Sequence, residues 1–513
     1  MKQNSSILGG AILLTAANLL LRLISIVFNV FLTDRIGASG LGLLQLISTI
    51  GIFAAIIGTS GVRVAAMYLA AEEFGHRRLG GVRTAISLCL RSGLVISGLA
   101  GIALFFLADF FAGHWLGDMR AVPSLRIMGL LLPFSCLCGV MTGYFTACAR
   151  IRQLVVIEII ERLLGMAITM LLLIFWAKED LSRACWAITF GSSAGAVFDF
   201  IFLYLLYRRS MRNVPTEKQA LHMGKRLRKL CIPLALNDYL RAGLNTAEQL
   251  LIPYGLTKFG GSTVQALASY GTIHAMVFPV LMFPAAILFS ISDLLVPALS
   301  RSRAMGLQIR IVDLTDKCIR MGLLFASAVA GFLFVNADAL GQLIYRNSQA
   351  GEYLRIFAPM VFLLYADIVV DGMLKGLAEQ VSCVRYNTIT SLLDVVLLYI
   401  LLPRWGVKGY IFSFSLTHAI NLFLSMRRLL VVTGHRVCAT DFLRPFLCLV
   451  LAVALIELLT LGSASLLVST LLRGGFFLLF LLTGFVCSGA FASRDYRWLR
   501  RVFRRSLPRR IDT

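Results

Sequence analysis

The side chains best suited to chemistry in this sequence are positively charged and amide groups inside long apolar segments. Arg22 and Asn29 lie in the apolar segment 7–33, and Arg241 lies in the segment 230–256. Ionisable side chains inside a bilayer are energetically costly, so those present usually face a bundle interior or a water-filled cavity. A guanidinium group in such a place binds phosphate or another anion without covalent chemistry. The pattern therefore predicts a binding site for an anionic polar group and no enzymatic activity.

Helical geometry gathers these residues on one face of each segment. At about 100° per residue, the polar side chains of segment 7–33 fall within about 80° of arc, and those of segment 230–256 within about 120°. A similar stripe of about 100° runs along segment 41–70 to Arg63. The candidate substrate-binding residues are Asn18, Arg22, Asn29, Arg63, Arg162, Asn237, Asp238, Arg241, Asn245, Glu248 and Gln249. We expect them to line a hydrated, partly cationic vestibule.

Each of these side chains also has a structural interpretation. Serine, threonine and asparagine often hydrogen-bond neighbouring membrane helices, and Arg241 could pair with Asp238 or Glu248 on its own helix. Arg63 could extend to the membrane surface, and the charged residues of the fifth segment could pair locally. Arg22 and Arg241 lie far from either end of their segments, so for these two the binding interpretation is favoured.

The segments that carry these residues belong to a membrane fold. Hydrophobic residues make up 58% of the 513 residues, charged residues 15%, and the mean hydropathy is +0.83. A helix needs about 20 apolar residues to cross a bilayer, so we predict an all-α membrane protein with fourteen transmembrane helices. They are placed at 7–33, 41–70, 83–108, 124–148, 153–177, 184–207, 230–256, 264–299, 314–336, 353–374, 383–402, 406–431, 442–461 and 465–491. Pro279 and Pro284 predict a bend in the eighth of these helices.

The net charge of +23 raises the question of a nucleic-acid partner. Most of the 49 lysine and arginine residues lie in connections that face the cytoplasm if the amino terminus does. This bias predicts that both termini are cytoplasmic, and it explains the charge without nucleic acid. The predicted location is the cytoplasmic membrane. The 11 cysteines show no metal-ligand spacing, so neither a metal nor a cofactor is predicted.

An internal repeat divides the chain. The stretch FLTDRIGASGLGLLQLISTIG resembles YGLTKFGGSTVQALASYGTI, and the comparison aligns Gly37 with Gly260. We expect two pseudo-symmetric lobes of six helices each, with a cavity between them and two further helices at the carboxyl end. The predicted parts are a first lobe at 1–207, a basic cytoplasmic linker at 208–229, a second lobe at 230–431, two helices within 432–491 and a basic tail at 492–513.

Four stretches resemble one transporter superfamily. They are AANLLLRLISIVFNVFLTDRIGASGLGLL at 16–44, GYFTACARIRQLVVIEIIERLLGM at 143–166, LMFPAAILFSISDLLVPALS at 281–300 and RIFAPMVFLLYADIVVDGMLKGL at 355–377. The chain resembles the multidrug, oligosaccharidyl-lipid and polysaccharide exporters. Within them it is most similar to the stage V sporulation protein B and polysaccharide-biosynthesis branch, which is related to the lipid II flippases. The resemblance implies a two-lobe transporter that exposes its cavity alternately to the two sides of the membrane and moves an undecaprenyl-linked sugar precursor outward.

The resemblance also implies roles for particular residues. Arg22 lies where lipid II flippases carry the first of two arginines that meet the substrate diphosphate, and Asn29 takes the place of the second. Pro279 and Met282 stand where those flippases carry an arginine and a glutamate. These departures weaken the lipid II assignment and favour a sporulation-type or capsule-type relative, whose cargo the resemblance leaves open.

Three functions follow as hypotheses. The leading one is a flippase that translocates an undecaprenyl-diphosphate-linked saccharide, a polysaccharide or peptidoglycan precursor, by alternating access. It would act as a monomer among membrane lipids, driven by the membrane potential or by a coupling ion, Na⁺ or H⁺. The alternative is a cation-coupled multidrug antiporter of the same superfamily, to which arginine-bearing stripes are less suited. A glycosyltransferase or ligase is disfavoured because the predicted external connections are short and contain no Asp-x-Asp pair.

Overall fold

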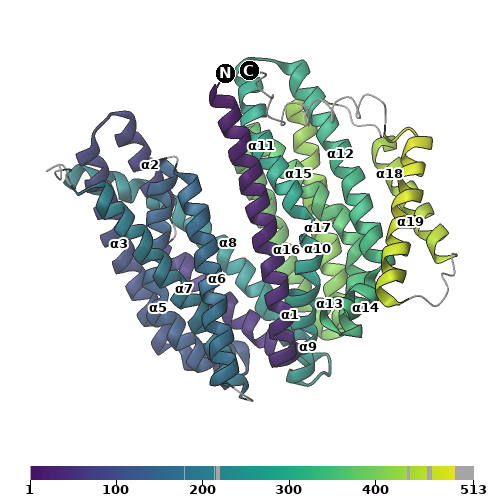
Figure 1. Ribbon diagram of the computed structural model, residues 1–513, viewed down its shortest axis with the longest axis horizontal. Helices are drawn as coiled ribbons and strands as arrows, with labels where there is room; N and C mark the ends of the chain where they lie inside the picture. The colour runs from purple at the N-terminus through teal and green to yellow at the C-terminus, as the bar shows by residue number, and fades with distance from the viewer. Residues whose placement is uncertain are drawn as a thin grey trace, which may run out of the picture. The chain divides into compact units, whose positions relative to one another are not determined.

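The protein is built from helices, as the computed structural model in Figure 1 shows. The structure describes residues 2–59, 61–148, 150–177, 180–212, 214, 220–435, 439–458 and 465–491, with side chains from Leu19 onward except at 151, 220–222, 294, 439, 441 and 442. No strand occurs in these ranges. The all-α prediction is therefore confirmed for the described part of the chain.

The helices follow the apolar segments of the sequence, with short π-helices and 3₁₀-helices labelled η. The first half contains α1 (Lys2–Thr59), α2 (Val62–Gly75), α3 (Leu79–Phe106), α4 (Ala108–Phe110), η1 (Phe111–Leu116), η2 (Met119–Ala121), α5 (Val122–Ala147), α6 (Ile151–Phe175), α7 (Leu181–Ser210), α8 (Ala220–Lys258) and α9 (Thr263–Gly271). The second half contains η3 (Thr272–Val277), α10 (Phe278–Met282), α11 (Ala285–Ala304), α12 (Gln308–Val335), α13 (Ala337–Tyr345), α14 (Ser348–Phe357), η4 (Ala358–Met360), α15 (Val361–Gly376), α16 (Gln380–Trp405), α17 (Val407–Thr433), α18 (Ala439–Glu457) and α19 (Leu466–Cys487).

Ten helical stretches of the described chain are long and apolar enough to cross a membrane. The long helices α6, α8 and α17 are not among the ten, and two of them, α6 and α8, carry candidate site residues. Length and hydropathy thus support a multi-pass membrane protein. Fourteen crossings with both termini in the cytoplasm remain a prediction.

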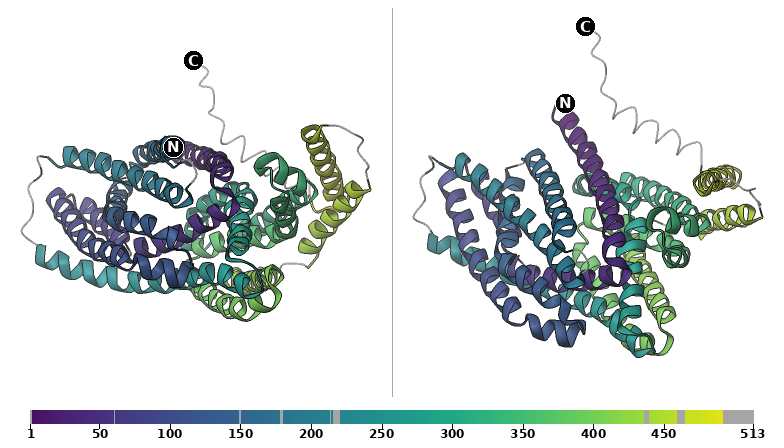
Figure 2. Two further views of the ribbon diagram at one scale, coloured as in Figure 1. Left: turned by 90° about the horizontal axis from the view of Figure 1, so that it is seen from below. Right: turned by 60° about the horizontal axis from the view of Figure 1, so that its bottom comes forward.

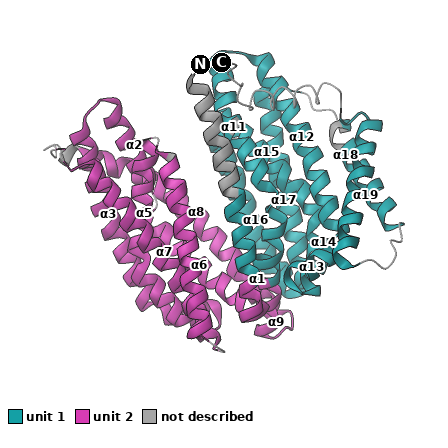
Figure 3. Ribbon diagram, viewed as in Figure 1, with its two compact units in different colours: residues 1–30, 272–513 teal, residues 31–271 magenta. Residues whose placement is uncertain are grey.

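Contacts divide the chain into two compact units (Figure 3). Unit 1 holds residues 1–30 and 272–513, and unit 2 holds residues 31–271. In unit 1, α12 packs against α15, α18 and α19, and α18 lies beside α19 (Figure 2). In unit 2, α5 packs against α2, α3 and α7. The two pseudo-symmetric six-helix lobes predicted at 1–207 and 230–431 remain a prediction.

The connection between α7 and α8 is shorter than the predicted linker 208–229. α7 extends to Ser210 and α8 begins at Ala220. Lysine and arginine have high helix propensity, so the basic sequence continues both helices beyond their apolar parts. Residues 213 and 215–219 of this connection lie outside the described residues, as does the predicted tail 492–513.

Glycines with positive φ mark the helix breaks in unit 2. Gly37 (φ 68°) interrupts α1, and Gly260 (φ 117°) lies between α8 and α9. The internal repeat aligns these two positions. A third glycine, Gly61 (φ 75°), lies at the start of α2. The stripe predicted along segment 41–70 required one unbroken helix, so its continuation to Arg63 was wrong, because only glycine adopts this conformation readily.

Two other glycines allow α1 to approach α9 closely within unit 2. A Cβ on Gly42 would lie 2.0 Å from the carbonyl oxygen of Leu267, and one on Gly271 would lie 2.2 Å from that of Ala38. Backbone atoms cannot move aside as a flexible side chain can. These contacts fix the crossing of α1 and α9 and require glycine at both positions.

Gly42→Leu is expected to destabilise the protein by about 3 kcal/mol or more, because the added side chain overlaps the backbone of α9. Thermal unfolding of the purified protein in detergent measures this loss. Gly98→Leu on α3 is the matched control, since a Cβ there meets nothing within 4 Å. Equal unfolding temperatures for the two variants would contradict the packing account.

Proline breaks a helix within unit 1, as predicted for segment 264–299. α10 ends at Met282 and α11 begins at Ala285, directly after Pro284. The N–H of Ala286 donates to the carbonyl of Phe283 at 3.3 Å, one residue short of its regular α-helical partner, Met282. The carbonyl of Met282 is therefore left for a donor from elsewhere, as at other proline breaks in membrane helices.

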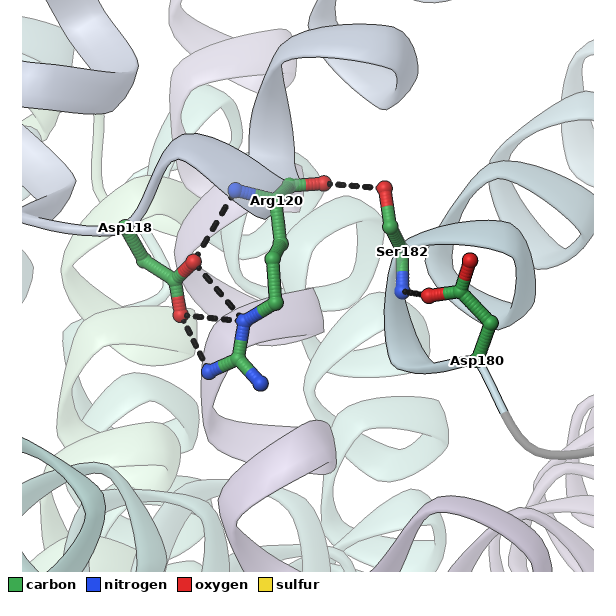
Figure 4. Close-up of polar contacts among 4 residues, drawn as sticks. All are labelled: Asp118, Arg120, Asp180 and Ser182. Carbon is green, nitrogen blue, oxygen red and sulfur yellow. Dashed lines mark hydrogen bonds and ion pairs between the residues drawn. The ribbon is translucent and has the colours of Figure 1, made fainter.

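A polar cluster ties two connections of unit 2 together (Figure 4). Asp118 accepts hydrogen bonds from the backbone N–H of Arg120 at 2.9 Å and from its guanidinium Nη2 at 2.6 Å. The carbonyl of Arg120 accepts from the hydroxyl of Ser182 at 3.1 Å. The N–H of Ser182 in turn donates to Asp180 at 2.9 Å, which caps the start of α7. The cluster thus joins the connection before α5 to the first turn of α7.

The ion pair in this cluster predicts a pH dependence of stability. Burial opposes ionisation of Asp118, but the hydrogen bonds and charge of Arg120 hold the pKa of its carboxyl below the usual value of 3.8. A lowered pKa means that the stabilising contribution is complete above about pH 4 and disappears as the pH falls through the folded-state pKa. Asp118→Asn should therefore unfold at a lower temperature than the native protein at pH 7, and the difference should shrink below pH 4. A difference independent of pH would contradict the assignment.

Candidate functional site

Arg22 donates a hydrogen bond to the backbone at the proline break of unit 1. Its Nη1 donates to the carbonyl of Met282, the carbonyl that the break leaves without its helical partner. Its guanidinium also lies over the ring of Phe289, 5.4 Å from the centroid. The side chain is half-buried, and the described residues include no carboxylate paired with it. One N–H group of Arg22 thus stabilises the helix break. No described acidic group neutralises the positive charge of Arg22.

Asn29 lies two turns further along the same stripe of α1. Its Nδ2 donates to the carbonyl of Ala275 in η3 at 3.2 Å. Ser25, between them, donates to the carbonyl of Leu21 in its own helix at 2.9 Å. Asn29 thus contacts a neighbouring element, as the structural interpretation expects, whereas Ser25 bonds only its own helix; a role of Asn29 in substrate binding remains a prediction. The side chain of Asn18, the remaining candidate on α1, lies outside the described residues.

An apolar groove of about 700 Å³ lies beside Arg22 in unit 1. α1 contributes Leu23 and Val27 to it, and the proline break contributes Phe283 and Pro284. The other lining residues come from α1, α10, α12, α13 and α19, and all are apolar. Its volume is within the range of about 300–1,000 Å³ that small-molecule sites occupy. Unit 1 therefore offers a cation and a long apolar surface within one or two helical turns of each other.

The candidate residues of α8 lie in unit 2. Asn237, Arg241 and Asn245 are exposed. Asp238, Glu248 and Gln249 are half-buried, and Gln249 accepts a hydrogen bond from Tyr270 of α9 at 2.6 Å. The Gln249 contact joins α8 to α9, and a role of Gln249 in substrate binding remains a prediction.

Arg241 differs from its neighbours on α8. The ion pair with Asp238 or Glu248 that the sequence allowed is not found, and Arg241 makes no hydrogen bond or ion pair with any described residue. An exposed, uncompensated guanidinium in a predicted membrane segment requires water or an anionic ligand. Arg241 is therefore the stronger of the two arginine candidates by geometry.

Two further candidate arginines are also exposed in unit 2. Arg63 lies in the first turn of α2, where its side chain passes Gly139 of α5; a Cβ on that glycine would be 3.8 Å from Cδ of Arg63. Arg162 lies on α6 and makes no ion pair with a described residue. Neither Arg63 nor Arg162 belongs to the same unit as Arg22. The structure groups the candidates by helix and unit, and whether all of them meet one substrate remains a prediction.

A buried polar cluster in unit 1 was not found from the sequence. The carboxylate of Asp394 on α16 is 5% exposed and accepts from Ser413 at 2.6 Å and Thr417 at 3.2 Å, both on α17. Nearby on α17, Asn421 donates to Asp367 of α15 at 3.0 Å. A buried carboxylate among hydroxyl oxygens can bind a proton or a hard cation. α17 supplies three of these groups at a spacing of four residues, but the two carboxylates come from α15 and α16, so the stripe on α17 alone does not indicate what it binds.

The sequence of residues 7–303 matches the family described as "Polysaccharide biosynthesis protein". This match covers more than half of the chain. The chain belongs to that family. The polysaccharide biosynthesis family was the branch indicated by the four stretches quoted above, and the matched residues include α1, the proline break and α8.

Two sporulation proteins of Bacillus subtilis (strain 168) are relatives of this family member. Stage V sporulation protein B is 22% identical over 411 residues, which cover 78% of this chain and 79% of the relative. Sporulation protein YkvU is 20% identical over 398 residues, covering 76% and 87%. The similarity to stage V sporulation protein B confirms the resemblance inferred from the sequence.

Solved transporter structures share the fold of this family member. Lipid II flippase MurJ in an inward closed conformation matches with a TM-score of 0.69 at 14% identity, over 95% of this chain and 99% of that chain. A MATE family multidrug transporter of the MOP superfamily in an inward-facing conformation matches with a TM-score of 0.61 at 12% identity, over 82% and 96%. Identities of this size establish the fold and leave the cargo open. The protein is thus a membrane protein with the fold of flippases and transporters.

Proposed function

We propose that this protein is a flippase that translocates an undecaprenyl-diphosphate-linked saccharide across the cytoplasmic membrane by alternating access. Such a cargo has a doubly charged diphosphate joined to a long apolar chain. It needs a cation and an apolar surface that are held close together. The pairing of Arg22 with the apolar groove of unit 1 is the observation that carries the proposal.

Arg22 and Arg241 are proposed to bind the diphosphate in the course of the transport cycle. A guanidinium offers several donors in a fixed plane, and charge-assisted contacts to phosphate are strong where water is partly excluded. Arg22 keeps donors beyond the one used by Met282, and Arg241 is exposed. The saccharide would meet the exposed amides of α8, Asn237 and Asn245.

The apolar groove of unit 1 is proposed to hold the part of the polyprenyl chain nearest the diphosphate. Burial of each methylene-sized group contributes about 0.8 kcal/mol. A chain lying between Val27 and Phe325 would therefore add to the affinity that the arginines supply. A cargo bound at both places is selected for its charge and for its lipid.

A reconstituted transport assay tests this proposal. The purified protein is placed in liposomes that contain a fluorescent undecaprenyl-diphosphate saccharide, and a membrane-impermeant quencher reports how much label reaches the outer leaflet. We expect protein-dependent exposure of label that had been in the inner leaflet. Liposomes with protein that expose no more label than protein-free liposomes would refute the flippase.

A multidrug antiporter is the second candidate function. The buried carboxylate of Asp394 favours it, because ion-coupled exporters depend on such groups. The fold alone serves both functions. Expression in a host without its own drug pumps separates them: resistance to cationic drugs, with no movement of the lipid-linked saccharide in liposomes, would establish the antiporter.

A further inference from the structure

A second apolar groove, of about 440 Å³, lies on unit 2 between α6 and α7. These two helices pack against each other. Val156 and Ile157 of α6 and Phe202 and Leu206 of α7 form its apolar walls. One end of the groove is polar and contains Arg152 and Gln153. Nothing in the proposed transport reaction uses this groove.

Helical spacing brings a second arginine to the same end. Along α7, Phe202, Leu206 and Arg209 fall within about 60° of arc, so Arg209 continues the wall of the groove. Along α6, Arg152 and Val156 fall within about 40°. α6 begins at Ile151 and α7 ends at Ser210, and the groove runs from these two ends along both helices. The groove therefore has an arginine on each wall at its polar end.

Both arginines are exposed and uncompensated. Neither Arg152 nor Arg209 makes an ion pair or hydrogen bond with a residue that the structure describes. Two more exposed arginines, Arg150 and Arg208, lie next to them in the chain. The acidic residue of α6 closest in sequence, Glu158, lies about 120° around the helix from Arg152. The polar end is thus positively charged with no described carboxylate to neutralise it.

Basic residues at helix ends can have a general role as orientation signals, and they then extend to the membrane surface individually. A residue with that role does not need an apolar groove beside it. Phe202 is 41% exposed and Val156 is 49% exposed, which leaves apolar surface open beside the charges. A phosphate group joined to an acyl chain matches both features at once.

We propose that the α6–α7 groove binds one anionic glycerophospholipid, with its phosphate at Arg152 and Arg209 and an acyl chain along Val156 and Phe202. Under the predicted orientation of the chain this lipid belongs to the cytoplasmic leaflet. The site goes beyond the proposed transport function and does not depend on it. Its ligand is a membrane component, and it lies in unit 2, whereas the apolar groove proposed for the cargo lies in unit 1.

Native mass spectrometry of the full-length, delipidated protein tests the site. Phosphatidylglycerol and phosphatidylcholine with identical acyl chains are titrated separately, and inorganic phosphate serves as a third ligand. We expect one phosphatidylglycerol to bind more tightly than phosphatidylcholine. Arg152→Ala combined with Arg209→Ala should weaken this binding about 30-fold, given the effect of about 1 kcal/mol per basic residue at the lipid surface. Inorganic phosphate should not displace the lipid.

Two variants make the result specific to the groove. Val156→Trp fills the apolar part and leaves both arginines in place, so it should also abolish the tight binding. Arg77→Ala combined with Arg78→Ala removes the same charge from an exposed loop of unit 2 and should leave it unchanged. Equal binding of both phospholipids by the native protein, or equal weakening by the two double-arginine variants, would overturn the proposal, as would displacement by inorganic phosphate.

Discussion

Arg22→Ala combined with Arg241→Ala is expected to abolish flipping of the lipid-linked saccharide. A hydrogen bond to a charged group contributes about 1.5–3 kcal/mol, so loss of both arginines should slow transport by about two to four orders of magnitude. The rate of label exposure in the liposome assay measures the effect. Each single variant should lose less transport activity than the double variant, because the diphosphate can still bind the remaining guanidinium.

The fold must survive these substitutions for the result to count. Arg22 donates to the carbonyl of Met282, so its loss leaves that carbonyl without this partner and costs some stability. Arg91→Ala combined with Arg301→Ala removes the same charge from two exposed positions outside the stripes and is the control. If the double variant at 22 and 241 still transports at the native rate while both proteins insert normally, the site assignment is wrong.

Filling the apolar groove of unit 1 should have the second-largest effect. Ala328 lies on its α12 wall, and Ala328→Trp places an indole where we propose the polyprenyl chain to lie. Displacing about three methylene-sized groups costs about 2.4 kcal/mol, which corresponds to a loss of about 60-fold in the efficiency of transport. The liposome assay at low cargo concentration measures this loss.

A shortened cargo distinguishes an occupied groove from a damaged protein. A saccharide diphosphate on a short prenyl chain does not reach the indole, so its transport by the Ala328→Trp variant should equal that of the native protein. Leu99→Trp adds the same indole to a lipid-exposed position of α3, where Leu99 is 64% exposed, and should leave both cargoes unaffected. Equal loss for the long and the short cargo would contradict a chain-binding groove.

The long helices could be predicted because apolar length is a property of a single segment. α3, α5, α16 and α17 begin and end within a few residues of the predicted ranges. The break at Pro284 was predictable too, since proline lacks the N–H that a helix needs. The break at Gly61 was missed because glycine is tolerated inside membrane helices, so its presence does not by itself predict a positive φ.

The sequence could predict the candidate site only where the spacing of residues along one helix determines which side chains share a face. Spacing identified the polar faces of α1 and α8 but could not tell which members serve packing. Asn29 and Gln249 proved to bond neighbouring elements, whereas Arg241 has no described partner. The apolar groove beside Arg22 is assembled from residues more than two hundred and fifty positions apart in the chain, such as Leu23 and Pro284. Such grooves depend on packing between helices, which the periodicity of residues along a single helix does not predict.

Positions 22 and 241 must both be reached by water during transport if the two arginines bind the diphosphate. A single cysteine is placed at each position in a background without native cysteines, and membrane-impermeant thiol reagents are applied from each side of the membrane. Labelling of both positions, with protection by the lipid-linked saccharide, is the predicted result. If neither position is labelled from either side while cysteines in the connecting loops are, the arginines lie sealed in protein or lipid, and the transport mechanism proposed here is contradicted.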